Sequence, residues 1–228
     1  TDRELKILQL TDTQIIDAAQ TRPGRPGVSY TLWGTDKMDE RCFNYVRETI
    51  EATNPDLILL TGDNVYGEFD DNGTALLGFI ELMESFQIPW SPIFGNHDNE
   101  SAMGVAWQCA QFEAAEHCLF KRNTLEGNGN YTVGIAQGGN LTRVFFMMDS
   151  NGCASPSRQS SNDGQVKLTP GFGEKQIAWF EEIGEKLCEI IVKKLFTVSN
   201  GLNSIGKAAL KSNCEKEKRN KTVTLKKT

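Results

Sequence analysis

The first hundred residues alternate short apolar runs with longer segments of helical periodicity. The apolar runs at residues 5–10, 57–60 and 89–94 are too short for helices and predict strands. Between them, residues 39–53 place apolar side chains four residues apart, and residues 74–86 place four along one side of a helix, namely Leu76, Leu77, Ile80 and Met83. Strands and helices that alternate in this order form right-handed crossovers, so we expect three parallel neighbouring strands.

The pattern changes after residue 100. A further helix is expected over residues 102–115, and strands at 129–133 and 143–148 flank a turn at Gly138-Gly139-Asn140. Residues 174–187 have an apolar face and predict a helix. Residues 190–196 allow either one more strand or an extension of that helix.

The last part of the chain has a different composition. Beyond Asn200 the sequence is polar and rich in Lys, which is typical of a solvated tail, although a patch for nucleic acid or anionic lipid is the alternative. We therefore expect an α/β domain over residues 1–187 and a divergent, basic and poorly ordered tail over residues 188–228.

The composition is that of an ordinary globular protein, with 39% apolar and 24% charged residues in 228. No apolar stretch approaches the roughly 18 to 20 residues that span a bilayer. The formal charge of −6 is uneven, because residues 206–228 carry eight Lys or Arg against two Glu. Residues 1–205 are therefore strongly acidic, which argues against general nucleic-acid binding and favours a divalent cation in a cleft.

The cellular location stays open. The six cysteines form no C-x-x-C pair, which argues against a zinc ribbon or a thioredoxin-like site. Glycosylation sequons at Asn72, Asn99, Asn130, Asn140 and Asn220 would suit a secreted or extracytoplasmic protein. The chain starts at Thr1, so a signal peptide could already have been removed, and a cytoplasmic location stays an alternative.

Polar residues follow each of the first three predicted strands. Asp12 follows the first, Gly62-Asp63 the second, and Gly95-Asn96-His97-Asp98 the third. In open α/β sheets, the loops at the carboxyl ends of neighbouring strands converge on one crevice. Three such loops carrying Asp, Asp, Asn and His suggest a metal site.

These groups resemble the first three blocks of the calcineurin-like metallophosphoesterases, written D-x-H, G-D-x-x and G-N-H-D/E. The matching segments are Asp12-Thr13-Gln14, Gly62-Asp63-Asn64 and Gly95-Asn96-His97-Asp98. The sequence that flanks these blocks is most similar to the branch with purple-acid-phosphatase-like plant proteins and Dcr2-type fungal phosphatases. The resemblance runs from about Leu5 to Leu187. It implies an α/β fold, a β-sandwich flanked by helices, here truncated or divergent at its C-terminal end.

The resemblance also implies a two-metal site that activates water against a phosphoester. Asp63 would bridge the two ions, Asp12 would bind the first, and Asn96 would bind the second through its amide oxygen. Gln14 stands where the family usually has His, and its neutral amide is a poorer donor. The ions would be divalent or trivalent Fe, Mn, Zn or Mg, with the identity open.

For the proton transfer, the resemblance implies that His97 acts as general acid or as an electrostatic aid to the leaving group. Asp98 would orient His97 by accepting its other N–H. The only other histidine, His117, is expected at a helix end or on the surface, and Asp149, at a strand end, is expected to fix the loop after it. Taken singly, Asp12, Asp63 and Asn96 could each be ordinary turn residues.

The later blocks of the family, an isolated His and then G-H-x-H, are absent from the sequence. We therefore expect a metal-dependent phosphoesterase with impaired activity; the alternative is a non-catalytic remnant of the fold that binds phosphate compounds or a partner. A basic-tailed binding protein is a third possibility. The expected substrate is a small-molecule or protein phosphoester, with no nucleic acid and no membrane span, and the oligomeric state stays open.

Overall fold

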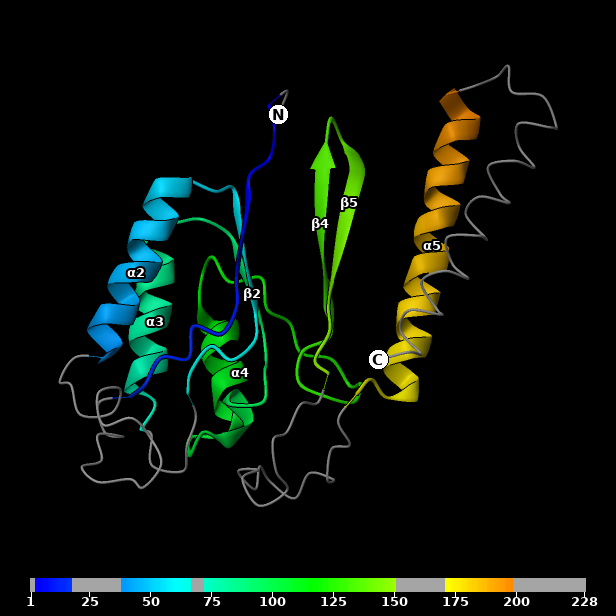
Figure 1. The fold of residues 1–228 in the computed structure, drawn as a ribbon. Helices are drawn as coiled ribbons and strands as arrows, with labels where there is room; N and C mark the ends of the chain where they lie inside the picture. The colour runs from blue at the N-terminus through cyan, green and yellow to red at the C-terminus, as the bar shows by residue number, and fades with distance from the viewer. Residues whose placement is uncertain (1–2, 18–37, 67–71, 151–170, 199–228) are drawn as a thin grey trace. The chain divides into compact units, whose positions relative to one another are not determined.

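The computed structural model describes residues 3–17, 38–66, 72–150 and 171–198 (Figure 1). The basic segment 206–228 and most of the polar loop after residue 150 lie outside the described residues. Internal contacts divide the chain into residues 1–172 and 173–228, and each unit is described by itself. The domain boundary expected at residue 187 stays a prediction.

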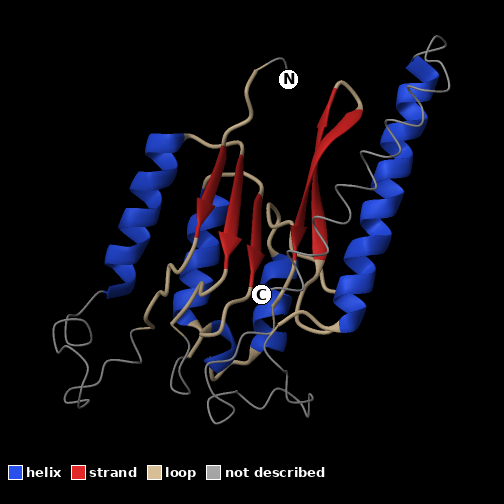
Figure 2. Cartoon of the chain, turned by 45° about the vertical axis from the view of Figure 1, so that its right-hand side comes forward, coloured by secondary structure: helices blue, strands red, loops and turns tan. Residues whose placement is uncertain are grey.

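The first unit is built on a three-stranded parallel sheet in the order β1–β2–β3. The strands are β1 (Ile7–Leu10), β2 (Leu57–Thr61) and β3 (Trp90–Ile93), as predicted. Leu10 pairs with Leu60, and Thr61 pairs with Ile93, so the carboxyl ends of all three strands lie together. Figure 2 shows the three arrows running in the same direction. The sheet therefore delivers its three following loops to one edge.

Two crossover helices connect these strands, α2 (Met38–Thr53) and α3 (Thr74–Ser85). Because the strand order follows the chain and such crossovers are right-handed, both helices lie on one face of the sheet. Figure 1 shows them side by side. Phe43 of α2 packs against Gly78 of α3, where an added Cβ would come within 3.1 Å of the Phe43 ring.

The expected apolar face of α3 is wrong in part. Leu77 is 40% exposed, and the buried residues of the helix are Ala75, Leu76, Phe79, Leu82 and Met83. Residues 75–83 are apolar on almost every side, so their periodicity alone could not select the face that meets the sheet. Packing of Phe79 and Met83 into the core determines the rotation of the helix.

An aromatic cluster fills the space between β3, α4 (Val105–Ala114) and the hairpin that follows. Phe112 lies at its centre, with its ring centroid 5.7 Å from both Trp90 and Phe94 and 5.6 Å from Phe120. The Tyr131 hydroxyl donates to the Pro92 carbonyl oxygen at 2.5 Å and lies 2.9 Å from the Ser91 hydroxyl. The hairpin is thus tied to β3 by both packing and hydrogen bonds.

The hairpin consists of β4 (Tyr131–Gln137) and β5 (Asn140–Met147), paired antiparallel. Gly138 and Gly139 form its two-residue turn with φ of 55° and 74°, which matches the left-handed turns that suit tight hairpins. Two strands around a glycine turn are confirmed, but their predicted bounds are wrong in part. β4 begins at Tyr131 instead of residue 129, β5 ends at Met147, and Asn140 belongs to β5 instead of the turn.

The second unit is described only through α5 (Glu174–Val198). The helix predicted over residues 174–187 therefore continues through residues 190–196, which resolves the choice between strand and helix there. At its start, the Gly173 N–H donates to Gln176 Oε1 at 2.8 Å, an arrangement that stabilises a helix N-terminus. In the part of the chain that the structure describes, no helix is long and apolar enough to cross a membrane.

Candidate functional site

The loops after β1 and β2 run together beyond the sheet. The Asp12 N–H donates to the Gly62 carbonyl oxygen at 3.1 Å, and the Gln14 N–H donates to the Asp63 carbonyl oxygen at 2.9 Å. A bridge between Ile15 and Val65 continues this parallel pairing. The first two candidate blocks are therefore held side by side by the backbone itself.

Three candidate residues have left-handed backbone conformations. The φ angles are 53° at Asp12, 40° at Gln14 and 50° at Asp63. Such a conformation costs an L-residue about 1 to 2 kcal/mol, and Asp tolerates it better than most. Strained positions of this kind gather at functional sites, where the surrounding structure holds them in place.

Asp63 lies where the strand-end loops meet, and the residue is 7% exposed. Its Oδ1 accepts the His97 backbone N–H at 2.9 Å, and its Oδ2 accepts a hydrogen from Gln14 Nε2 at 3.1 Å. Gly95 lies directly against it, since an added Cβ there would overlap Asp63 Oδ1 and the Asp63 backbone nitrogen. The absence of a side chain at residue 95 allows the two loops to approach this closely.

Asp98 is fully buried and fastens the loop after β3 to the loop after β2. Its Oδ1 accepts N–H groups from Asn64 at 2.9 Å and Val65 at 3.1 Å, and its Oδ2 accepts the Gly95 N–H at 2.7 Å. Burial raises the pKa of Asp98 to about 7, against the lowering effect of the Gly95 and Val65 N–H donors.

The orientation of His97 differs from the sequence prediction. The imidazole Nδ1 lies 3.0 Å from Glu100 Oε2, so Glu100 occupies the place predicted for Asp98. The reason is the single 3₁₀ turn η2 (Asp98–Glu100), which directs Asp98 inward and brings residue 100 beside residue 97. One face of the His97 ring stacks on the ring of Tyr66, with the ring centroids 4.5 Å apart and the ring planes at 27°.

Glu100 and Tyr66 were both missed by the sequence analysis. Each lies three residues beyond a candidate residue, Glu100 after His97 and Tyr66 after Asp63. A 3₁₀ turn after His97 would have been the signal for Glu100, but nothing in the local sequence distinguishes such a turn from the start of an α-helix. Only the fold reveals that Tyr66 meets His97.

The remaining candidates are placed less tightly. Asp12 is exposed, and its Oδ2 accepts the Thr11 hydroxyl at 2.5 Å, while Asn96 is half-buried in the turn before His97. Gln14 turns its amide nitrogen toward Asp63. The structure thus brings together Asp63, Gln14 and His97.

The donor atoms at the strand ends fit a metal ion only incompletely. Two carboxylates and the amide oxygens of Gln14 and Asn96 are suitable donors for a hard or borderline cation. However, the described residues contain no group of three or more His, Cys, Asp or Glu side chains placed to hold an ion. The ligand atoms that the described residues offer at the strand ends are therefore too few to hold two metal ions.

The second histidine lies at the opposite end of the sheet. The His117 carbonyl oxygen accepts the N–H of Trp90, the first residue of β3, and its imidazole Nδ1 lies 2.9 Å from Glu84 Oε2. Asp149 is buried and accepts the Asn128 N–H at 2.7 Å, so it fixes the loop before β4. The loop after Asp149, which it was expected to fix, lies largely outside the described residues.

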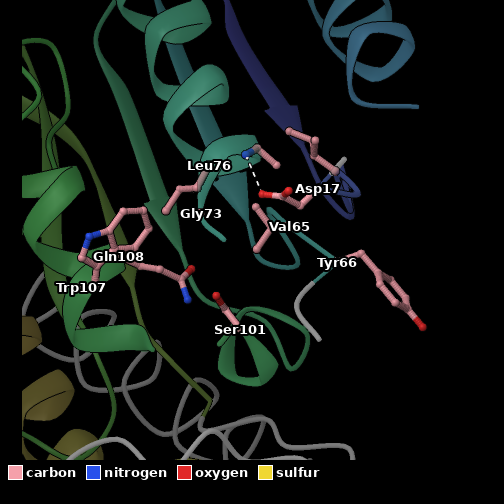
Figure 3. Close-up of a pocket in the computed structure, with 10 residues that line it drawn as sticks. Asp17, Val65, Tyr66, Gly73, Leu76, Ser101, Trp107 and Gln108 are labelled. Carbon is pink, nitrogen blue, oxygen red and sulfur yellow. Dashed lines mark hydrogen bonds between the residues drawn. The ribbon is translucent and has the colours of Figure 1, made fainter. Parts of the chain in front are cut away.

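A small pocket lies next to the loop of Asp98 (Figure 3). Asp17 lines it and accepts the Ala75 N–H at 3.1 Å, the contact drawn as a dashed line, and so caps α3. Gln108 lines it as well and donates from Nε2 to the Asp98 carbonyl oxygen at 2.7 Å. The volume of this pocket is about 10 Å³, which is room for about one water molecule. A substrate does not fit there.

The sequence matches the profile of the family described as "Calcineurin-like phosphoesterase" over residues 5–211. The chain belongs to the calcineurin-like phosphoesterase family. Its mixed α/β fold is consistent with this family of hydrolases, whose members use divalent metal ions.

Relatives within the family include plant and fungal proteins. The chain is 34% identical over 204 residues to "Probable inactive purple acid phosphatase 14" of Arabidopsis thaliana, covering 82% of this chain and 48% of that protein. It is 42% identical over 159 residues to "Probable inactive purple acid phosphatase 28" of the same plant, with coverages of 60% and 38%. "Phosphatase DCR2" of Saccharomyces cerevisiae is 27% identical over 117 residues, with coverages of 50% and 20%. The chain thus spans less than half of the length of these relatives.

Proposed function

We propose that this chain carries the first half of a metal-dependent site for hydrolysing phosphoesters and that, by itself, it binds metal weakly and hydrolyses slowly. The observation that carries the proposal is the junction at Asp63, where the loops of three parallel strands meet. There the His97 N–H and the Gln14 amide both donate to one carboxylate. Family membership supports the reaction class.

Each residue has a proposed task. Asp63 and Asp12 supply carboxylates to bound ions, and Asn96 and Gln14 supply amide oxygens; Gln14 must first turn its amide around. Divalent ions in such a site lower the pKa of bound water and neutralise charge on the phosphoryl oxygens. His97 gives a proton to the leaving oxygen. Asp98 keeps the His97 loop against the Asp63 loop through its backbone contacts.

The proposed weakness follows from the number of donors. The first motif block holds Gln14 in place of an imidazole, and the chain contains only His97 and His117. His117 is engaged with Glu84 at the amino end of β3. An ion held mainly by Asp63 and Asn96 keeps most of its water and dissociates readily.

The first experiment measures Mn²⁺ binding by calorimetry and hydrolysis of p-nitrophenyl phosphate with Mn²⁺, Zn²⁺ or Mg²⁺. Asp63→Asn is expected to weaken Mn²⁺ binding by about tenfold or more, because it removes a carboxylate donor. His97→Ala is expected to lower the rate by roughly 10² while leaving Mn²⁺ binding intact. The matched control is Glu48→Gln, the same chemical change at an exposed residue of α2. Equal Mn²⁺ binding by Asp63→Asn and Glu48→Gln contradicts the proposal.

A second candidate is a non-catalytic remnant of the fold that binds phosphate compounds or a partner. The names of two Arabidopsis relatives, which call them probable inactive, favour it. Hydrolysis no faster than that of the His97→Ala variant, together with Mn²⁺-dependent binding of inorganic phosphate that Asp63→Asn abolishes, would favour this candidate over the enzyme.

A further inference from the structure

We infer that Glu100 is a positioning residue, which holds the His97 imidazole in a single tautomer with the hydrogen on Nδ1 and Nε2 left to carry the transferable proton. The inference rests on the proposed function, in which His97 serves the leaving oxygen. The third motif block ends at Asp98 and does not include residue 100. Its structural basis is the 3₁₀ turn that follows His97.

The first argument is the geometry of that turn. The Glu100 N–H donates to the His97 carbonyl oxygen at 3.0 Å, which closes a single turn between the two residues. In a 3₁₀ turn the side chains of residues i and i+3 are eclipsed, so residue 100 stands beside residue 97. Asp98 is rotated by about a third of a turn and faces Asn64 and Gly95 instead. The 3₁₀ turn therefore gives Asp98 and Glu100 different roles. Asp98 anchors the loop, and Glu100 is the hydrogen-bond partner of the His97 imidazole.

The second argument is the burial of Glu100. The residue is 1% exposed, its Oε2 lies 3.0 Å from His97 Nδ1, and its Oε1 has no hydrogen-bond partner among the described residues. A buried carboxylate is costly, and an apolar side chain of similar size is often at least as stable. The contact with His97 is what offsets this cost.

The tautomer follows from the chemistry of the pair. An ionised carboxylate only accepts hydrogen bonds, so the hydrogen between the two side chains belongs to Nδ1. When Nδ1 carries the hydrogen that is bonded to Glu100, Nε2 is the nitrogen that gains or loses a proton. The hydrogen bond made by one ring nitrogen thus determines the protonation of the other. Stacking on Tyr66 fixes the plane of the ring, while the contact with Glu100 fixes which of the two ring edges, Nδ1 or Cδ2, faces that residue.

The chain contains its own matched comparison. His117 and Glu84 form a second pair, with Nδ1 2.9 Å from Oε2, at the other end of the sheet. The two imidazoles of the chain give two sets of ring signals in long-range ¹⁵N–¹H NMR spectra, which report the protonated nitrogen directly. A variant at residue 100 should change only one set, and a variant at residue 84 only the other.

The test uses the full chain with ¹⁵N-labelled histidine. In the unaltered protein we expect neutral His97 to carry its hydrogen on Nδ1. Glu100→Met removes the acceptor and keeps the volume, so His97 should shift to the Nε2–H form that free imidazoles prefer, with His117 unchanged. Glu100→Gln keeps an acceptor oxygen and should restore the Nδ1–H form in part. Glu84→Gln should move only the His117 signals.

An Nε2–H form in the unaltered protein would overturn the inference. Persistence of the Nδ1–H form in Glu100→Met would do so too, even if the variant were less stable. Where p-nitrophenyl phosphate is hydrolysed, Glu100→Met should lower kcat by about tenfold with KM unchanged. An inactive chain refutes the proposed function alone, because the tautomer is read without turnover.

Discussion

At the scale of single residues, Gly95 is the position where one atom decides whether the site can form. The loops after β2 and β3 approach so closely there that a Cβ would overlap both the carboxylate and the backbone nitrogen of Asp63. The atoms in the way are backbone and a side chain held by hydrogen bonds, so neither can move aside cheaply.

Gly95→Ala should therefore lower the free energy of unfolding by about 2 kcal/mol or more, measured by urea denaturation. Gly184→Ala is the matched control, because nothing lies within 4 Å of an added Cβ at that position of α5. It should leave the stability unchanged or raise it by up to about 1 kcal/mol, since Ala favours helices. Equal losses for both variants would contradict the close approach.

The sequence predicted the positions of the candidate residues better than their partners. Asp12, Asp63 and His97 follow their strands as expected, because a parallel sheet presents its carboxyl ends at one edge. The partner of His97 could not be predicted, because Asp98 and Glu100 are both acidic neighbours and only a 3₁₀ turn selects between them. The metal-ligand roles of Asp12, Gln14, Asp63 and Asn96 stay predictions.

At the scale of elements, Glu84 connects α3 to the segment that leads into the aromatic cluster. Its carboxylate accepts hydrogens from Trp90 Nε1 at 2.6 Å, from the Glu116 N–H at 3.0 Å and from the His117 N–H at 3.1 Å. Burial opposes ionisation of Glu84, but the donors of Trp90 and His117 outweigh it and lower its pKa. One side chain thus holds the end of a helix, the start of a strand and a loop.

Glu84→Ala should destabilise the protein by about 2 to 3 kcal/mol, because several N–H donors lose a charged acceptor together. Hydrogen exchange should quicken at the Leu119 N–H, which is bonded to the Trp90 carbonyl oxygen at 2.8 Å. Glu81→Ala, at an exposed position of the same helix, should change stability by less than about 0.5 kcal/mol. Unaltered exchange at Leu119 in Glu84→Ala would count against this role.

Element types were largely predictable, whereas buried faces were not. A continuous apolar run such as Leu57–Leu60 is typical of a strand covered on both sides, and these four residues are buried. In α3 the apolar residues surround the helix, so its orientation depends on contacts distant in sequence. The local sequence pattern therefore determines whether a segment is a helix or a strand, and tertiary packing determines which face of it is buried.

At the scale of the molecule, two buried thiols among the described residues, Cys109 and Cys118, resist ionisation. Burial raises the pKa of both Cys109 and Cys118 to about 12, from an ordinary value of 9.0. Above pH 9 the unfolded chain loses these protons while the folded chain keeps them. Folding is then linked to proton uptake, so stability must fall as the pH rises.

Between pH 8.5 and pH 10, each thiol should reduce the free energy of unfolding by about 1 kcal/mol. Cys109→Ala and Cys118→Ala should each remove about that much of the alkaline loss, measured by urea denaturation at the two pH values. The measurement at pH 8.5 separates the packing cost of the lost sulfur from the proton linkage. Variants that lose as much stability as the parent over this interval would disprove the linkage.

Burial also bears on the sequons. Asn99 and Asn130 are 8% and 2% exposed, and Asn130 Nδ2 donates to the Glu126 carbonyl oxygen at 2.9 Å. Asn72 and Asn140 are exposed, the latter beside the hairpin turn. Asn220 lies outside the described residues. In the folded chain, Asn99 and Asn130 are therefore poorly accessible to a glycosylating enzyme.

The Asp98 carboxylate also sets the order in which the protein can assemble. Its bonds to the N–H groups of Asn64 and Val65 join positions 34 and 33 residues apart. Closing a loop of that length costs chain entropy, which the pairing of β2 with β3 must offset first. On the ribosome, the loop after β3 can therefore bond to the loop after β2 only once residue 98 has emerged. The loops of Asp12 and Asp63 can come together earlier, because they pair through backbone hydrogen bonds of their own.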